Sequence, residues 1–388
     1  MAIYNILNIA DIHFGAMKPD QLLYELEIID EFIEQFGESL DMIVINGDYW
    51  DSKMGLYTKS AIAGIKWMTD LVTKCNYKNI HVVIYKGTIS HDDDQLEVFR
   101  SLEDSFPRFT IINENTYMKF KDLNLLFLPD ENMNLDDYYM KYLDNYVREK
   151  EDIDIAFFHG NADFVMKSFM TQESELDSHN SVLFEYDFWN KMVKGPLIAG
   201  HWHTYMKKGN WYYVGSYSRW KFGEEDPKGA LLVSYNTDTS EYFTYRIIND
   251  RCPQYKAYQI PTKLYNSVEE YITIIEKIRE DISSDENLNV KIEILITDNK
   301  AENDAYIQLI KESFLGNKKV KIVLKNKVEI EKRKAKRDEE IVHNQRFDFI
   351  IKGGLSEAEK FQRFILEKYG ESVPLDFIEK TISKLKSK

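Results

Sequence analysis

The chain has 388 residues, of which 44% are hydrophobic, and a formal net charge of −15. This length suggests two or three domains with substantial cores, and no run of eighteen apolar residues occurs, so we expect no membrane span. The N-terminus lacks the pattern of a secretory signal, and Cys75 and Cys252 show no paired spacing. We therefore expect a cytoplasmic protein with reduced thiols.

The first hundred residues alternate between apolar runs of strand length and amphipathic stripes of helical period. Strands are predicted at residues 3–10, 41–46 and 80–85, and helices at 22–36, 59–75 and 94–105. A polar cluster follows each strand: Asp11 with His13, then Asp48 with Asp51, then His91 with Asp92. In open α/β sheets ligands bind beyond the carboxyl ends of the strands, so we expect the three clusters to share one edge.

The chain is richer in β structure from residue 110 onward. We expect strands at 110–113, 117–120, 123–128, 153–158, 196–199, 211–214, 230–235 and 242–248, and a helix at 135–149. His159 ends one of these strands, and His201 and His203 follow another, where Gly200 frees the backbone to turn. A polar, irregular segment covers 161–187. The pattern predicts an α/β fold with two packed sheets flanked by helices.

A boundary near residues 251–261 opens a smaller unit. Helices at 268–282 and 301–314 and strands at 290–297 and 320–324 predict a compact α/β module. Residues 318–337 hold ten lysines and arginines against two glutamates, a run typical of a solvated linker that also keeps a nucleic-acid partner admissible. Two helices close the chain, one capped by Ser356 and Glu359 and one beginning at Pro374. We expect domains at 1–252, 253–327 and 328–388.

Seven acidic and imidazole residues lie at the ends of five predicted strands. They are Asp11, His13, Asp48, His91, His159, His201 and His203, and they include five of the eight histidines in the chain. Each alone is compatible with a surface or core role, but their shared position favours a metal centre. Mixed oxygen and imidazole donors suit Mn²⁺, Fe²⁺ or Zn²⁺ better than Mg²⁺ or Ca²⁺. Two ions need a bridging carboxylate that screens their repulsion, and Asp48 is the natural candidate.

The motifs Asp-x-His, Gly-Asp-x-x-Asp, a glycine-led His-Asp, His-Gly and Gly-His-x-His occur in this order. In residues 1–252 they resemble the motifs of the calcineurin-like metallophosphoesterases. Within that family the chain is most similar to the SbcD-type nuclease subunit of DNA double-strand-break repair complexes of bacteria or phages. The segment from Gly215 and Ser216 through Arg219 to Lys228 and Gly229 adds to this likeness.

The resemblance implies a two-sheet αββα sandwich with a small α/β capping domain and C-terminal helices. It implies that one ion is held by Asp11, His13, Asp48 and His203, and a second by Asp48, His159 and His201. It also implies that His91, oriented by Asp92, stabilises or protonates the leaving oxygen while a water activated by the ions attacks phosphorus.

One motif departs from the family. The usual Gly-Asn-His-acid sequence is here Gly87-Thr88-Ile89-Ser90-His91-Asp92, so the asparagine that would bind the second ion is missing. Either Thr88 or Ser90 offers a neutral oxygen, or water fills the position, or the longer loop re-aims His91. We expect a more weakly bound second ion or a strong preference for Mn²⁺. Asp51 either orients a ligand histidine from outside the metal shell or caps a helix.

The resemblance leads to a Mn²⁺-dependent DNA exonuclease or endonuclease, with Mg²⁺, Fe²⁺ or Zn²⁺ as other possible ions. It implies a homodimer that works with an SbcC-type ATPase in DNA recombination, repair or replication, with the C-terminal helices as the docking site. A phosphoesterase for a phosphoprotein or small nucleotide is one alternative, and a non-catalytic scaffold with a decayed metal site is another. The aromatic cluster Trp202, Trp211, Tyr212, Tyr213, Tyr217 and Trp220 is more typical of core than of base stacking. We expect His81, His179 and His343 to be structural or exposed.

Overall fold

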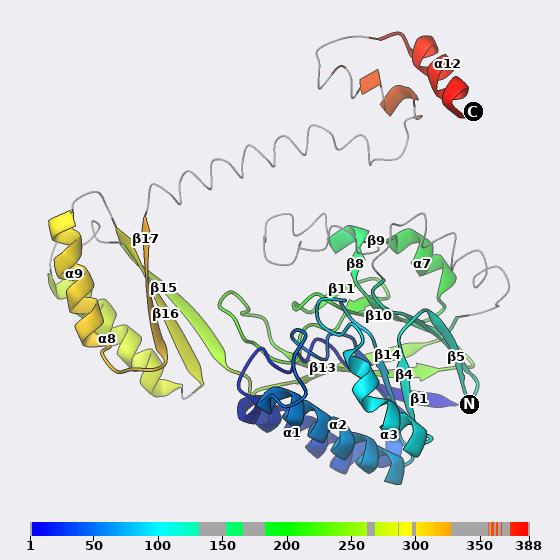
Figure 1. Cartoon of the computed structure of the whole chain (residues 1–388), viewed down its shortest axis with the longest axis horizontal. Coiled ribbons are helices and arrows are strands. Elements are labelled where there is room, and N and C mark those ends of the chain that lie inside the picture. The colour runs from blue at the N-terminus through cyan, green and yellow to red at the C-terminus, as the bar shows by residue number, and fades with distance from the viewer. Residues whose placement is uncertain are drawn as a thin grey trace. The chain divides into compact units, whose positions relative to one another are not determined.

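The computed structural model describes residues 2–131, 153–165, 183–261, 268–285, 287–296, 300–326 and 373–386, together with seven positions between 356 and 366. The predicted helix at 135–149, the end of the basic run at 327–337, His179 and His343 lie outside these residues. The chain divides into two compact units, Met1–Lys256 with Asp281–Val290, and Ala257–Glu280 with Lys291–Lys388 (Figure 1).

The larger unit contains a first six-stranded mixed sheet in the order β14-β13-β1-β2-β3-β4. Its strands are β1 (Ile3–Ile9), β2 (Met42–Asn46), β3 (His81–Tyr85), β4 (Phe109–Ile112), β13 (Gly229–Asn236) and β14 (Tyr242–Ile248). Strands β1 to β4 are parallel, whereas β13 and β14 add an antiparallel edge. The parallel strands are connected through the helices α1 (Pro19–Phe36), α2 (Lys59–Tyr77) and α3 (Arg100–Ser105), as βαβ crossovers require.

A second six-stranded mixed sheet has the order β11-β12-β10-β7-β6-β5. Its strands are β5 (Thr116–Phe120), β6 (Leu123–Leu128), β7 (Ile155–His159), β10 (Leu197–Gly200), β11 (Met206–Lys208) and β12 (Trp211–Tyr213). The helix α7 (Tyr186–Met192) follows the short parallel pair β8 (Asn161–Ala162) and β9 (Leu183–Phe184). The pair β8 and β9 and the start of α7 lie within 161–187, so the prediction of irregular structure is wrong at these residues. Residues 166–182 of that segment are outside the described chain.

Alternating side chains place the two sheets against each other. Val44 and Val83 of the first sheet share one buried apolar cluster with Phe127, Phe157 and Ile198 of the second. The intervening residues of the first sheet pack with α1 and α2, and those of the second pack with α7, in two further clusters. Because side chains of a strand alternate between the two faces, strands that carry apolar residues throughout bury both. The predicted α/β fold is confirmed.

The smaller unit holds most of a three-stranded sheet in the order β15-β16-β17. Its elements are β15 (Gln254–Pro261), α8 (Val268–Ser284), β16 (Leu288–Ile296), α9 (Lys300–Ser313) and β17 (Val320–Asn326). The last four match the predicted helices and strands, whereas β15 lies where we had predicted only a boundary. Near the C-terminus, Ser356 and Glu359 form the predicted reciprocal cap, with Glu359 N donating to Ser356 Oγ at 3.2 Å. The last helix, α12 (Leu375–Lys386), begins directly after Pro374.

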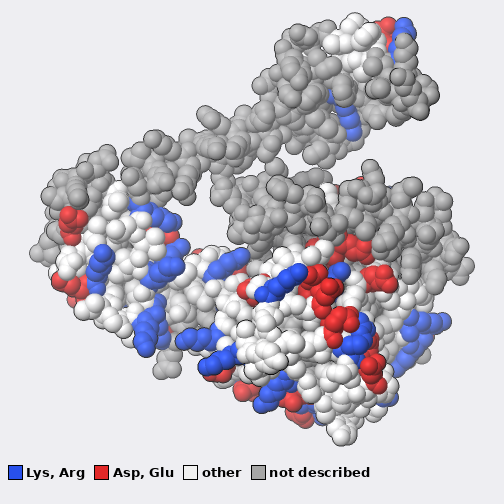
Figure 2. All heavy atoms as spheres, in the orientation of Figure 1, with Lys and Arg blue, Asp and Glu red and all other residues white. Residues whose placement is uncertain are grey.

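Charged side chains are mixed over the larger unit. Figure 2 shows acidic and basic residues interspersed on the face in view. Among the described residues, no helix combines the length and apolarity that crossing a membrane requires.

Candidate metal centre

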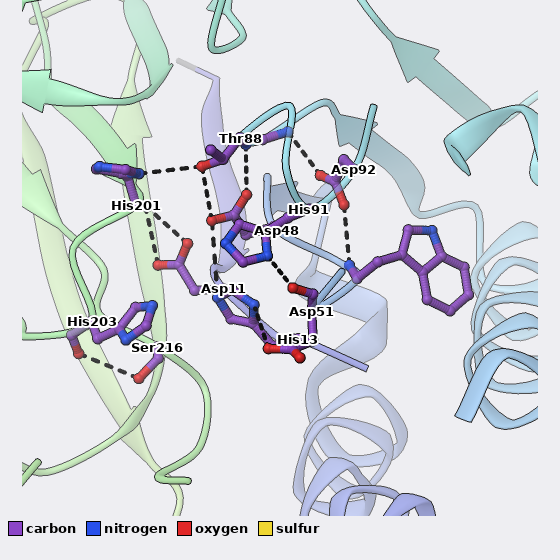
Figure 3. Close-up of polar contacts among 12 residues, drawn as sticks. Asp11, His13, Asp48, Asp51, Thr88, His91, Asp92, His201, His203 and Ser216 are labelled. Atoms are coloured by element: carbon purple, nitrogen blue, oxygen red, sulfur yellow. Dashed lines mark hydrogen bonds and ion pairs between the residues drawn. The ribbon is translucent and has the colours of Figure 1, made fainter. Parts of the chain in front are cut away.

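The carboxyl ends of five strands meet at one place in the larger unit. Strand register aligns Ile9 of β1 with Ile45 of β2, and Gly200 of β10 with His159 of β7. Backbone hydrogen bonds continue past the strands, from Asp11 N to the carbonyl oxygen of Gly47 at 3.2 Å and on through the following residues. The loops after β1, β2, β3 and β10 therefore hold their polar side chains in one cluster (Figure 3). His159 at the end of β7 belongs to the same cluster, because its Nε2 lies 3.2 Å from Asp48 Oδ2.

Left-handed backbone is concentrated in this cluster. Eight non-glycine residues of the described chain have positive φ, and four of them are predicted ligands: Asp11 (49°), His13 (52°), Asp48 (49°) and His201 (89°). Such conformations cost about 1–3 kcal/mol each and persist where the surrounding structure fixes them. The backbone strain thus turns side chains at the strand ends toward a common point.

Three glycines allow the loops to approach this closely. A Cβ atom at Gly47 would lie 2.2 Å from His159 Nδ1, and one at Gly87 would lie 2.1 Å from Asp48 N. At Gly200, a Cβ atom would lie 2.1 Å from the carbonyl oxygen of Asn46. All three values are well below any tolerable contact, so the sequence at the strand ends requires glycine for the geometry of the centre.

Asp48 belongs to two groups of potential ligands. One group is Asp11, His13 and Asp48, and the other is Asp48, His159 and His201; in each, one donor atom per residue lies within 4.8 Å of the others. Four of these five residues are buried, and His201 has intermediate exposure. Asp48 Oδ2 lies 3.2 Å from His159 Nε2 and 3.9 Å from His13 Nε2. A carboxylate in this position is able to bridge two ions.

Unpaired nitrogen atoms show that the cluster fits a metal. Both ring nitrogens of His13 are buried without a hydrogen-bond partner. A buried polar atom without a partner is costly, and metal coordination would satisfy it. His159 is oriented for the same purpose, since its Nδ1 lies 2.9 Å from the carbonyl oxygen of Asn46 and its Nε2 faces Asp48. A backbone carbonyl that fixes the second ring nitrogen is a common support for a metal-bound histidine.

The pKa shifts in the metal-free cluster also favour a metal site. Burial lowers the pKa of His13 well below its usual value and that of His201 to about 3, so both rings are neutral. Burial opposes a charged His159, but the attraction of Asp48 prevails and raises its pKa to about 10. Burial raises the pKa of Asp11 to about 6, with the charge of Asp48 adding to the effect. A protonated His159 beside Asp48 supplies the positive charge that an ion would bring.

His203 lies beside His13 and outside the two groups. The centroids of the two rings are 5.2 Å apart. Glu224, which we had not predicted, lies 3.1 Å from His203 Nδ1 and would direct Nε2 toward an ion. The carbonyl oxygen of His203 accepts hydrogen bonds from Ser216 N at 3.0 Å and from the buried Lys228 Nζ at 2.7 Å. Ser216 and Lys228 belong to the segment 215–229, which follows the last histidine motif and forms part of the sequence resemblance.

His91 is positioned by a backbone group. Its Nδ1 donates to the carbonyl oxygen of Asp51, and its ring centroid is 4.7 Å from that of His13. The Asp51 carboxylate lies 3.7 Å from His13 Nδ1. His13, Asp51 and His91 also form a third group with donor atoms within 4.8 Å of one another.

Asp92 differs from the expectation that it orients His91. Its two carboxylate oxygens accept hydrogen bonds from Gly87 N at 2.8 Å and from Trp50 N at 3.1 Å. Burial raises its pKa to about 7, with the charge of Asp48 as a further cause. Asp92 therefore ties the loop after β3 to the loop after β2, and its effect on His91 is through the backbone.

Thr88 and Ser90 occupy contrasting positions. Thr88 Oγ1 lies 3.2 Å from Asp48 Oδ2 and 3.3 Å from each of His159 Nε2 and His201 Nδ1. Thr88 N donates to Asp48 Oδ1 at 2.6 Å. Ser90 is exposed, and its side chain makes no hydrogen bond to the described residues of the cluster.

The aromatic cluster is largely core, as predicted. Trp202, Trp211, Tyr212, Tyr213 and Tyr217 are buried. Trp220 is the exception, because it is half-buried and its ring centroid lies 4.7 Å from that of His13 and 4.9 Å from that of His203. Away from the centre, His81 bonds Thr110 at 2.9 Å, and burial lowers its pKa to about 4, in agreement with a structural role.

Comparison with known proteins identifies no family for this chain. No family model matches the chain, and no curated protein matches it. One solved crystal structure aligns with 63% of this chain and 99% of its own length, at 11% identity and a TM-score of 0.38. Neither the fold nor the function follows from a likeness at that level.

Proposed function

We propose that this protein is a metal-dependent phosphodiesterase of the calcineurin-like metallophosphoesterase family, and that it acts on DNA as a nuclease. The observation that carries the proposal is the position of Asp48 between two groups of ligands, one with Asp11 and His13 and one with His159 and His201. The two packed mixed sheets, with helices on their outer faces, support the αββα sandwich that this family implies.

The donor set supports two divalent metal ions. Carboxylate oxygens and imidazole nitrogens suit Mn²⁺, with Fe²⁺, Zn²⁺ or Mg²⁺ as alternatives. Two such ions would supply a water nucleophile and stabilise the charge of a displacement at phosphorus. Asp48 would bridge them. Asp11 and His13, with His203 beside them, would hold one ion, and His159 and His201 the other.

His91 would handle the proton of the leaving oxygen. Because its Nδ1 donates to the Asp51 carbonyl oxygen, the proton that moves is the one on Nε2. A protonated Nε2 donates to the leaving oxygen, and the neutral ring regains a proton from solvent, which its intermediate exposure permits. The tether to Asp51 keeps the ring at the edge of the ligand cluster, close to His13.

DNA as the substrate is supported by the sequence resemblance and the basic run at 318–337. The test is degradation of an end-labelled DNA duplex in Mn²⁺ by the native chain, Asp48→Asn and His91→Ala. Both variants should lose activity, and Asp48→Asn should lose metal binding as well. Equal cleavage by the native chain and His91→Ala would remove His91 from the chemistry. Cleavage of a generic aryl phosphate ester with no cleavage of DNA would favour a phosphoesterase for small substrates instead.

A partner ATPase of the SbcC type and a homodimer are part of the same proposal and rest on the resemblance. In the described part of the C-terminal helices, Phe377 of α12 has 62% of its surface exposed and Leu366 has 50%. Exposed apolar side chains on an amphipathic helix suit docking on a partner. Phe377→Ala should weaken co-purification with the ATPase and leave cleavage of short single-stranded DNA unchanged. Full retention of the partner would rule out this docking surface.

A further inference from the structure

We infer that the hydroxyl of Thr88 is the fourth protein ligand of the ion held by Asp48, His159 and His201, in place of the asparagine that the family uses. This inference rests on the metal centre of the proposed function. It decides which of the two hydroxyls in the lengthened loop, that of Thr88 or that of Ser90, would bind the ion. It also makes this chain's second ion site different in chemistry from that of its suggested family.

The distances around Thr88 Oγ1 are those of neighbouring ligands on one ion. Metal–ligand bonds of about 2.1 Å place adjacent ligand atoms about 3.0 Å apart in an octahedral site and about 3.4 Å apart in a tetrahedral one. Thr88 Oγ1 lies 3.2 Å from Asp48 Oδ2, 3.3 Å from His159 Nε2 and 3.3 Å from His201 Nδ1. One oxygen at this distance from three donor atoms at once completes a set of four.

The loop absorbs its two extra residues without moving Thr88 from the cluster. His91 N donates to the Thr88 carbonyl oxygen at 2.9 Å, which closes a turn with Ile89 and Ser90 at its two central positions. Ser90 points to solvent from this turn. Gly87 allows Thr88 to approach, because the Gly87 backbone lies directly against Asp48. The insertion therefore extends outward, and the residue before it takes the place of the asparagine.

Thr88 also connects the second ion to His91. Its side chain faces the ligands, its N–H holds Asp48 Oδ1 at 2.6 Å, and its carbonyl oxygen accepts from both His91 N and Asp92 N at 2.9 Å. An ion that fixes the Thr88 side chain would also fix the first residue of the turn that carries His91. Loading of the second site would thus order the proton donor.

The ligand charges make the second ion the weaker one. Asp11 and the shared Asp48 give the first ion two carboxylates, whereas the second has Asp48 and three neutral donors. A site with less negative charge holds a dication less tightly. We therefore expect two steps of binding, with the Asp11 site filled first and the Thr88 site filled at higher Mn²⁺ concentration.

The test is Mn²⁺ binding by the full chain, measured by isothermal titration calorimetry and by metal analysis after equilibrium dialysis. The variants are Thr88→Val, which keeps the shape and removes the oxygen, Thr88→Ser, which keeps the oxygen, and Ser90→Ala as the matched control. Thr88→Val should keep the first ion at its native affinity and bind the second on the order of 10–100-fold more weakly. Thr88→Ser and Ser90→Ala should both retain two ions. The retained first ion shows that the Thr88→Val protein is folded.

Three results would overturn the inference. The first is a second ion bound as tightly by Thr88→Val as by the native chain, and the second is loss of that ion in Ser90→Ala. The third is a native chain that binds fewer than two ions. A native chain that binds two ions, loses one in Thr88→Val and yet cleaves no phosphodiester would leave the inference standing and refute the proposed function.

Discussion

His159 should make metal binding strongly dependent on pH. In the metal-free protein its Nε2 lies 3.2 Å from the Asp48 carboxylate, and this attraction outweighs burial and raises the pKa of His159 to about 10. A histidine binds a metal only through a deprotonated nitrogen. The ion that joins Asp48, His159 and His201 must therefore displace the proton on His159 Nε2.

The size of the effect follows from the pKa. At pH 7 the solution is about three pH units below the pKa of His159. Removal of the proton from His159 therefore costs on the order of 4 kcal/mol, at 1.36 kcal/mol per unit. Between pH 6.5 and 8.5 the affinity for this ion should rise about tenfold per pH unit, with about one proton released per ion. The stability of the metal-free protein should change with pH in the opposite direction. Because the folded pKa of His159 is raised, its stabilising contribution is complete below pH 6.5 and is lost as the pH rises toward 10.

Calorimetric titration with Mn²⁺ at pH 6.5, 7.5 and 8.5, in buffers of different ionisation enthalpy, measures both the affinity and the released proton. His81→Ala is the matched control, because His81 has a pKa lowered to about 4 and stays neutral over this range. The control should show the native pH dependence. A dissociation constant that does not change with pH, or an enthalpy that does not change with buffer, would refute the reasoning.

Three other substitutions probe the supports of the centre. The Cβ atom of Gly47→Ala would lie 2.2 Å from His159 Nδ1, at a residue with a φ of +75°. This substitution should therefore lower the free energy of unfolding by about 1–3 kcal/mol in urea titrations. Native stability would show that the backbone at residue 47 is not constrained. Glu224→Gln should lower the affinity for the ion near His203 on the order of 10–100-fold in calorimetry, whereas unchanged affinity would remove Glu224 from the support of that histidine. Trp220→Phe should abolish most of the change in tryptophan fluorescence on Mn²⁺ binding, because the Trp220 ring lies 4.9 Å from His203, and a persistent change would place the reporting tryptophan elsewhere.

Sequence alone predicted most of the strands, though not β8, β9, β11 or β15, and it predicted the polar residues that follow β1, β2, β3, β7 and β10. Short apolar runs ending in polar residues mark parallel strands, and parallel strands put their carboxyl ends at one edge. This reasoning found Asp11, Asp48 and His159 although they are far apart in the chain. It also found α8, β16, α9 and β17, where helical and strand periods alternate clearly, but it missed β15.

The contacts that orient the ligands were not predictable in the same way. Glu224 reaches His203 from a loop of irregular backbone, and no periodicity or spacing marks it. Asp92 follows His91 directly, which suggested a role on that ring, but the turn that begins at Thr88 directs its carboxylate to backbone N–H groups. Sequence neighbours in a turn point in different directions, so adjacency does not establish contact.

The choice between Thr88 and Ser90 also required the structure. Both are hydroxyl residues in the same loop, and only the closure of the turn on the Thr88 carbonyl shows which of them remains inside the cluster. The left-handed backbone of Asp11, His13 and Asp48 was equally hidden, since positive φ is uncommon even for aspartate and histidine and nothing in the sequence marks these positions. These conformations arise from the way neighbouring loops bind one another across the strand ends.

The central claim is that Asp48 joins two ions in one pocket. An anomalous difference map from crystals of the protein grown in Mn²⁺ tests this most directly. The account predicts two peaks about 3.5–4 Å apart, both bound to Asp48, one also bound to Asp11 and His13 and the other to His159 and His201. A map with no peak at Asp48, or with ions bound only elsewhere in the molecule, would contradict it.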